Sequence, residues 1–193
     1  MQKSNNLAVL ILAAGKSSRL GVITKQLLKY KDESFLKIAV KKALEISSNV
    51  YVVLGHNSEK CQKELAQFDI NILYNKDYEK GLGSSLSFGI SSTSKFENTL
   101  VLLCDQPFIP LSHLEKLKNS IDNKTIISSF YKHTNKSTVP AIFPKKYYAE
   151  LEKLNEDFGA KHLLQNSQTI NIELEKEFAV DIDTKEDIEK YLK

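Results

Sequence analysis

The sequence has little arginine, little cysteine and no long apolar run. Its 27 basic residues include one arginine, and its two cysteines, Cys61 and Cys104, lack metal-ligand spacing, so we expect both to be reduced structural thiols. No apolar run approaches the ~18 residues that a membrane span needs, and the start of the chain is polar. These absences predict a cytoplasmic protein without a signal peptide or a membrane partner.

The charges are spread along the whole chain. The 27 basic and 24 acidic residues leave a net charge of +3, and because they do not cluster we expect no nucleic-acid partner. The four histidines have neither zinc-site spacing nor a nearby serine or cysteine that suggests a catalytic triad. We expect the histidines to be structural or solvated.

Apolar segments of strand length alternate with segments of helical period. This alternation is typical of βαβ units and predicts an α/β fold, with a mainly parallel sheet covered by helices on both faces. At 193 residues and 41% hydrophobic content, we expect one domain over residues 1–193. The predicted strands cover residues 8–13, 50–54, 70–74, 100–104, 126–131, 139–143, 169–174 and 178–182.

The helices are predicted from serines that precede segments of helical period. The expected capping residues of the first four helices are Ser34, Ser58, Ser84 and Ser112. Further helices are expected at 145–154 and 160–164. Thr184 followed by Asp187 predicts a capping box at the start of the last helix.

The single arginine lies in a loop of small residues directly after the first predicted strand. Residues 13–21 offer backbone N–H groups, two serine hydroxyls and the cations Lys16 and Arg19, and Lys25 follows. Such a nest with positive charge binds polyphosphate well. The loop matches neither the Walker motif nor the dinucleotide fingerprint, which argues against a kinase or a dehydrogenase. An ordinary tight turn after a strand is the alternative.

Three aspartates follow or lie within apolar segments. Asp105 emerges at the carboxyl end of the strand 100–104, while Asp181 and Asp183 share one face of the predicted strand 178–182. Mg²⁺ is commonly held by one or two carboxylates plus substrate phosphates, so Asp105 with one of the other two could form such a site. The alternatives are a turn cap for Asp105 and a solvated face for Asp181.

Six motifs follow one another along the chain. They are 12–15 with Ser17, Arg19, Gly21, Lys25 and 27–28; Asn75 with 81–86; 103–107; 140–144; 157–161; and 181–184. In this order they resemble the motifs of the MobA-like NTP transferases, most closely the molybdenum cofactor cytidylyltransferases. The resemblance implies a Rossmann-like, GT-A-type nucleotidyltransferase that joins a nucleoside monophosphate to a terminal phosphate, without a covalent enzyme intermediate.

The resemblance also implies roles for individual residues. Arg19, Lys25 and Asp105 would be the catalytic groups, with Arg19 on the β- and γ-phosphates and Lys25 on the α-phosphate. Asp105 and Asp183 would hold Mg²⁺. The implied nucleotide-binding residues are Leu12, Ala13, Ala14, Gly15, Ser17, Arg19, Lys25, Gly55, Asn75, Ser84 and Ser85, and the implied acceptor-binding residues are Asp157, Gly159, Ala160, Lys161 and Asp181.

The identity of the two substrates depends on smaller details. The cytidylyl members of the family resemble this chain in having Ala-Ala-Gly in the first loop, so Ala14 points to CTP, and the implied acceptor is molybdopterin, with transient contact to a molybdoenzyme. Lys161 stands where the family commonly has arginine, and lysine cannot reproduce a bidentate phosphate grip. A sugar phosphate or another small phosphorylated acceptor therefore stays open, as does a non-catalytic accessory role.

Overall fold

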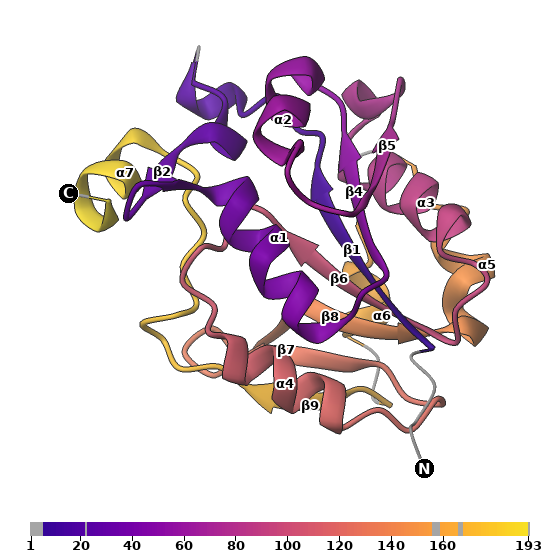
Figure 1. Cartoon of the computed structure of the whole chain (residues 1–193). Coiled ribbons are helices and arrows are strands. Elements are labelled where there is room, and N and C mark those ends of the chain that lie inside the picture. Colours follow the sequence, from indigo (N-terminus) through magenta and orange to yellow (C-terminus); the bar gives the residue numbers. More distant parts are fainter. Residues whose placement is uncertain (1–5, 22, 156–158, 166–167, 193) are drawn as a thin grey trace.

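The framework of the protein is a seven-stranded sheet with the order β5-β4-β1-β6-β8-β7-β9 (Figure 1). The computed structural model describes residues 6–21, 23–155, 159–165 and 168–192. The strands are β1 (Leu7–Ala13), β4 (Val50–Leu54), β5 (Asn71–Tyr74), β6 (Asn98–Leu103), β7 (Ile127–Tyr131), β8 (Lys136–Pro144) and β9 (Ile170–Glu173), with β2 (Lys29–Tyr30) and β3 (Glu33–Ser34) in a separate hairpin.

The direction of the strands confirms the predicted fold class. Strands β5, β4, β1 and β6 are parallel, and β9 is parallel to β7. In the described part of this seven-stranded sheet, only β8 runs antiparallel to its two neighbours, β6 and β7. The fold is therefore α/β and Rossmann-like, with a mainly parallel sheet.

Strand β1 explains why the sheet needs cover on both faces. All of its side chains are buried, and it pairs with β4 on one side and β6 on the other. Val9 and Ile11 pack into one hydrophobic cluster, whereas Leu10 and Leu12 pack into a second cluster on the opposite face. A nearly continuous apolar run of this kind is typical of a strand buried between two helical layers.

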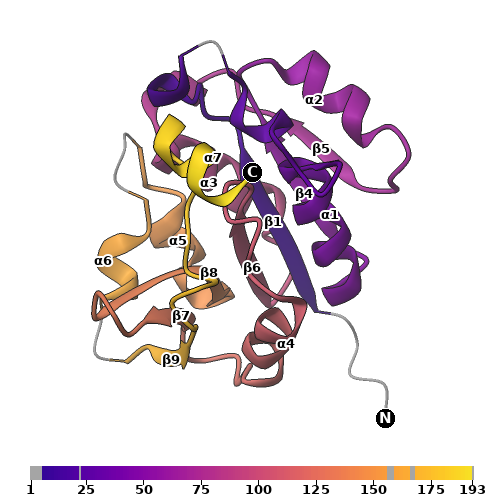
Figure 2. The ribbon, with the colours of Figure 1, turned by 90° about the vertical axis from the view of Figure 1, so that its left-hand side faces the viewer.

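The helices form these two layers (Figure 2). Helices α1 (Phe35–Ile46), α2 (Ser58–Leu65) and α4 (Leu111–Asn119) pack against the first cluster, and α3 (Leu82–Ser92), α5 (Tyr148–Leu151) and α6 (Lys161–Leu164) against the second. The last helix, α7 (Lys185–Tyr191), lies beside the β2–β3 hairpin in Figure 1. In the described part of the chain, no helix is long and apolar enough to cross a membrane.

The capping predictions have mixed outcomes. The Ser34 side chain accepts a hydrogen bond from the Lys37 amide at the start of α1, and Thr184 with Asp187 forms the expected capping box of α7. The other three caps were placed too far along the chain, because these helices start where the backbone leaves an extended or left-handed conformation. Their N-caps are Asn57 (φ 52°), Gly81 (φ 110°) and Pro110 instead of Ser58, Ser84 and Ser112.

The predicted strand at 178–182 is wrong. The amides of Phe178 and Ala179 bond to the Glu175 carbonyl, which closes a turn, and the following residues are irregular. Ile182 is fully buried, and its amide donates to the Asp105 carbonyl at 3.1 Å. The aspartates therefore alternate with apolar residues in an irregular segment, which is held by the buried Ile182 and is not a strand of the sheet. The helix predicted at 145–154 is also shorter, because a 3₁₀ turn (Lys145–Tyr147) precedes α5.

His113 gives the fold a testable pH dependence. This side chain of α4 is buried, and its Nε2 lies 2.8 Å from the hydroxyl of Ser129 in β7. Because Ser129 donates its own proton to the Pro140 carbonyl, the hydroxyl oxygen accepts from the Nε2–H group of His113. Burial lowers the pKa of His113 from 6.5 to about 4, with a smaller contribution from Lys116.

We predict that His113 destabilises the fold in acid. Between pH 6.5 and pH 4 the unfolded chain binds the proton more readily than the folded chain, so the free energy of unfolding should fall by up to about 3 kcal/mol. The variant His113→Gln keeps a donor for Ser129 but does not titrate, so it should lack this part of the acid destabilisation. Urea unfolding over this pH range measures the difference, and parallel curves for the two proteins would contradict the prediction.

Candidate functional site

A pocket of about 400 Å³ opens at the carboxyl ends of β1 and β6. Ligands of open α/β sheets gather at this edge. One wall is the loop after β1, a second is the 3₁₀ turn Tyr78–Lys80 with the start of α3, and the third is the end of β6. The lining residues are Leu12, Ala13, Ala14, Gly15, Lys16, Ser17, Ser18, Lys25, Gln26, Tyr78, Glu79, Gly81, Leu82, Ser85, Leu103, Cys104 and Asp105.

The loop after β1 is held in shape by Gln26. This side chain is buried, and its Nε2 donates to the carbonyls of Ala13 and Gly15, both at 2.8 Å. Ser17 adopts a left-handed conformation with φ 58°, and its hydroxyl accepts from the Lys25 amide at 3.1 Å. Gln26 and Lys25 thus fix the backbone of the loop whose N–H groups are candidates for binding an anion.

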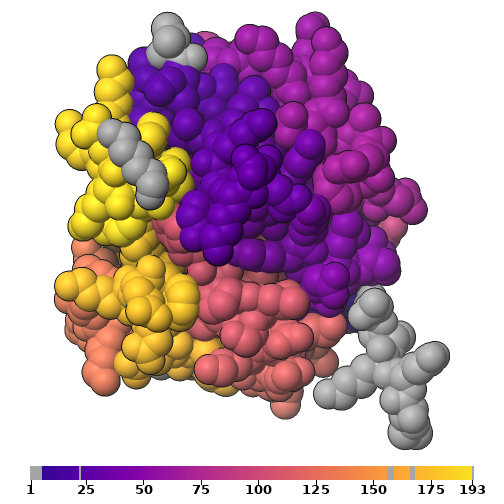
Figure 3. Space-filling model, turned by 60° about the vertical axis from the view of Figure 1, so that its left-hand side comes forward, coloured from indigo at the N-terminus to yellow at the C-terminus, as the bar shows by residue number. Residues whose placement is uncertain are grey.

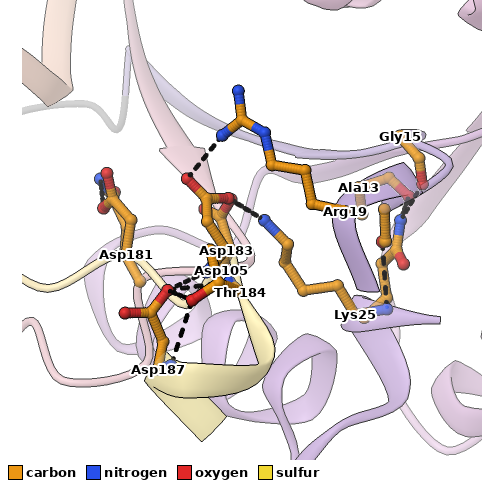
Figure 4. A network of polar contacts seen from close by, with 12 residues as sticks. Ala13, Gly15, Arg19, Lys25, Asp105, Asp181, Asp183, Thr184 and Asp187 are labelled. Atoms are coloured by element: carbon orange, nitrogen blue, oxygen red, sulfur yellow. Dashed lines mark hydrogen bonds and ion pairs between the residues drawn. The ribbon is translucent and has the colours of Figure 1, made fainter. Parts of the chain in front are cut away.

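The charged centre of the site is the ammonium group of Lys25 (Figure 4). It lies 2.9 Å from Asp105 Oδ2 and 2.5 Å from Asp183 Oδ1. Burial lowers the pKa of Lys25, but the charge of Asp105 and the hydrogen bonds to Asp183 and Asp105 outweigh this effect, so the pKa is raised above 10.5. Arg19 is 75% exposed and approaches the far oxygen of Asp183 at 3.7 Å. One partly buried cation therefore joins two carboxylates.

Hydrogen bonds connect the segment 181–183 to Asp105 and Gln106. The Ile182 amide bonds to the Asp105 carbonyl, and the side chain of Gln106 donates to Asp181 Oδ1 at 2.9 Å. The ring of Phe108 lies between those of Tyr30 and Tyr191, with centroid distances of 5.0 and 6.0 Å. Figure 3 shows the resulting contact, in which C-terminal residues in yellow lie against the indigo N-terminal region.

The loop after Asp105 is supported from α1. Lys42 Nζ donates to the carbonyls of Pro107 at 2.7 Å and Ile109 at 2.6 Å. Burial lowers the pKa of Lys42 to about 8. These two hydrogen bonds hold the backbone of the loop that directly follows Asp105.

The two carboxylates fit a divalent cation that also binds the substrate. Asp105 Oδ1 is buried and has no hydrogen-bond partner among the described residues, so a ligand oxygen is available there. In the same part of the chain, no group of three or more His, Cys, Asp or Glu side chains forms a complete metal site. Asp105 and Asp183 would therefore supply part of the coordination, and phosphate oxygens would have to supply more.

A second pocket of about 420 Å³ adjoins the first and shares Leu12, Leu82 and Leu103 with it. Its polar lining includes Lys136 and Lys161. Four of the residues predicted to bind the acceptor line this pocket, namely Gly159, Ala160, Lys161 and Asp181. Asp157 lies outside the described residues.

The nucleotide-binding residues predicted from the sequence divide into two groups. The first group lines the first pocket and consists of Leu12, Ala13, Ala14, Gly15, Ser17, Lys25 and Ser85. Asp105 also lines this pocket. Arg19, Gly55, Asn75 and Ser84 are not part of its lining. Gly55 lies behind the wall, where an added Cβ would come within 2.6 Å of the Tyr78 side chain and 2.8 Å of the Ala14 carbonyl. Asn75 contacts Ser84 and Ser85 instead.

Several residues of the two pockets escaped the sequence analysis. Gln26 acts on a loop that precedes it by more than ten positions, and Tyr78 and Glu79 lie in a turn without a recognisable motif. Glu79 forms an ion pair with Lys16 that links two walls of the first pocket. The sequence offered one indication for Gln26: it directly follows Lys25, and a residue beside a predicted phosphate ligand is a candidate for positioning that ligand.

The two cysteines take no visible part in the chemistry. Both are buried and free, as expected for reduced structural thiols. Cys104 borders the first pocket, but burial raises the pKa of its thiol far above the ordinary value, so the group stays protonated. Burial also raises the pKa of Cys61, to about 11. A thiolate nucleophile at this site is therefore disfavoured.

We predict that Gln26→Glu destabilises the protein. The carboxylate has the size of the amide but cannot donate, so it would face the carbonyl oxygens of Ala13 and Gly15 in a buried place. The free energy of unfolding should fall by about 2 kcal/mol. Urea unfolding measures this loss. The control is Gln62→Glu on the exposed side of α2, and equal effects of the two changes would contradict the assigned role of Gln26.

The chain is similar to known proteins over most of its length. Residues 9–171 match the MobA-like NTP transferase domain. The bifunctional protein GlmU of Aliarcobacter butzleri is 35% identical over 127 residues, which cover 63% of this chain, so the chain spans only 28% of that protein. The molybdenum cofactor cytidylyltransferase of Escherichia coli is 24% identical over 180 residues, covering 92% of this chain and 91% of that protein.

Solved structures support the same fold. Rv0371c of Mycobacterium tuberculosis superimposes with a TM-score of 0.84 at 23% identity, covering 96% of both chains. A second structure of that protein, in complex with manganese, gives a TM-score of 0.80 at 21% identity, covering 96% of this chain and 97% of that chain.

Proposed function

Because the chain belongs to the MobA-like NTP transferase family of nucleotidyltransferases, we propose that it transfers CMP from CTP to the terminal phosphate of molybdopterin and releases pyrophosphate. The observation that carries this proposal is the position of Lys25 between Asp105 and Asp183, in a pocket that continues into a second pocket with cationic walls. This arrangement suits charge neutralisation on a triphosphate beside a phosphorylated acceptor.

The triphosphate binds along the loop after β1. Backbone N–H groups of residues 13–18 and the side chain of Lys16 hold the β- and γ-phosphates, and Lys16 exchanges its exposed partner Glu79 for phosphate. Arg19, which is largely exposed, turns toward the same phosphates. Holding the pyrophosphate end of the nucleotide leaves the α-phosphate near Lys25.

The transfer is an in-line displacement at the α-phosphorus. An oxygen of the acceptor's terminal phosphate enters from the second pocket and forms the new phosphorus–oxygen bond, while the bond between the α- and β-phosphates breaks and pyrophosphate leaves. Lys25 neutralises the charge that builds up at the α-phosphate, and Lys161 holds the acceptor's phosphate. No covalent enzyme intermediate is required.

Asp105 and Asp183 would hold a divalent cation, which we propose to be Mg²⁺. The chemistry that this cation would supply is neutralisation of charge on the phosphates. Two observations support the assignment: the unpartnered Oδ1 of Asp105 in this chain and the manganese complex of Rv0371c.

The base and the acceptor are the finer parts of the proposal. CTP is supported by Ala14 in the pocket wall and by the similarity to the Escherichia coli cytidylyltransferase. The second candidate is transfer to a sugar phosphate. It is favoured by the second pocket, whose lining includes the polar residues Thr134, Ser137 and Thr138 together with Lys161 in place of an arginine.

We predict that pyrophosphate release depends on CTP and on molybdopterin. The test measures pyrophosphate with CTP, GTP, ATP or UTP, with Mg²⁺, and with molybdopterin or a sugar phosphate as the acceptor. CTP-dependent release with molybdopterin is the expected result, and Asp105→Ala should abolish it by removing a metal ligand. Release only with a sugar phosphate would establish the second candidate, and nucleotide binding without release would indicate an accessory protein.

We also predict that Lys25 competes with the cation in the free enzyme. Because its ammonium neutralises both carboxylates, Lys25→Met should bind Mn²⁺ more tightly in the absence of nucleotide, by about tenfold. Electron paramagnetic resonance of Mn²⁺ measures the affinity. Turnover with CTP should fall at the same time, because the charge at the α-phosphate is no longer neutralised.

The matched control for this change is Lys145→Met. Lys145 pairs with Glu97, directly before β6, and therefore lies at the opposite end of that strand from Asp105. Its replacement should leave Mn²⁺ affinity unchanged. If Lys25→Met and the control bind Mn²⁺ equally, Lys25 does not compete for the metal position.

A further inference from the structure

The buried side chain of Asn75 has a fixed orientation at the end of β5. Its Oδ1 accepts a hydrogen bond from the Asp77 amide at 2.9 Å. Its Nδ2 donates to the hydroxyl oxygens of Ser84 and Ser85, both at 3.1 Å. A backbone amide can only donate, so Oδ1 must face Asp77 and the two N–H bonds must face the serines.

The two serines use their hydroxyl protons differently. The Ser84 hydroxyl donates a hydrogen bond to the Asp77 carbonyl at 3.1 Å, and Ser84 is not part of the pocket lining. Ser85 is buried, lines the first pocket, and accepts from Asn75. Within the described ranges, no protein acceptor takes the proton of Ser85. Its hydroxyl is therefore a hydrogen-bond donor that remains for a ligand in the pocket.

The surroundings of Ser85 suit a nucleobase. Ser85 and the apolar residues Leu12, Tyr78 and Leu82 line the same pocket as the cationic residues that would hold the phosphates. Gly55 has no side chain, so the Tyr78 side chain packs directly over its backbone, where a Cβ would meet both Tyr78 and the Ala14 carbonyl. Apolar side chains beside an oriented donor can bind a base and distinguish its polar edge.

We propose that Asn75 is a positioning residue that sets the polarity of the Ser85 hydroxyl, so that Ser85 selects a base with a hydrogen-bond acceptor at this point. Cytosine presents the neighbouring acceptors N3 and O2, whereas guanine presents N–H donors on the corresponding edge. The inference rests on the proposed nucleotidyl transfer and deepens it, because it assigns the choice of CTP over GTP to Asn75 and Ser85, which lie outside the loop proposed to hold the phosphates.

The test is the variant Asn75→Asp. The carboxylate keeps an acceptor for the Asp77 amide but can no longer donate, so Ser85 would turn its proton toward residue 75 and its lone pairs toward the pocket. Isothermal titration calorimetry with CTP and with GTP, each with Mg²⁺, measures the ratio of the two affinities. We expect this ratio to fall by about tenfold or more, through weaker binding of CTP.

Two further variants make the result specific. Ser85→Ala should lose CTP affinity without gaining affinity for GTP, and Ser84→Ala should leave the ratio unchanged, because Ser84 does not line the pocket. Equal losses of CTP and GTP affinity in Asn75→Asp would show a merely structural role and overturn the inference. So would an unchanged ratio in both Asn75→Asp and Ser85→Ala.

The same titrations separate this inference from the proposed function. If the wild-type protein binds nucleoside triphosphates with no preference for CTP over GTP, the role of Asn75 and Ser85 is refuted while nucleotidyl transfer stands. If it binds no nucleoside triphosphate, the proposed function fails, and the inference fails with it.

Discussion

The ion pairs of Lys25 with Asp105 and Asp183 are the interaction on which the site depends. The partners lie 80 and 158 positions from Lys25 in the sequence, so these contacts join the loop after β1, the loop after β6 and the C-terminal segment. Without the ammonium or another cation between them, the two carboxylates would repel each other in a partly buried place. The residues that neutralise phosphate charge in the proposed reaction thus also hold the three segments together.

The sequence predicted the half of the site that local patterns determine. Apolar runs marked β1 and β6, and the carboxyl ends of parallel neighbours must meet at one edge, so the loop carrying Lys25 and the position of Asp105 followed directly. The capping box at Thr184 was equally local. These features need only a few neighbouring residues to define them.

What the sequence could not predict depends on contacts between distant segments. The alternation of aspartates with Val180 and Ile182 resembled a strand, yet only the contact of Ile182 with Asp105 explains it. Gln26 and Tyr78 carry no motif, and their importance comes from the loop backbone and from the missing side chain of Gly55. Arg19 was the most conspicuous residue in the composition, but in the free protein it is exposed and contacts Asp183 rather than the pocket.

The proposed reaction links the charged centre to the second pocket, because the acceptor must reach the α-phosphate beside Lys25. Mass spectrometry of the acceptor after incubation with the enzyme, CTP and Mg²⁺ tests this account most directly. The account predicts molybdopterin heavier by one cytidylyl group, with one pyrophosphate released for each product molecule. Molybdopterin that remains unmodified, whether or not CTP is hydrolysed, would contradict the account.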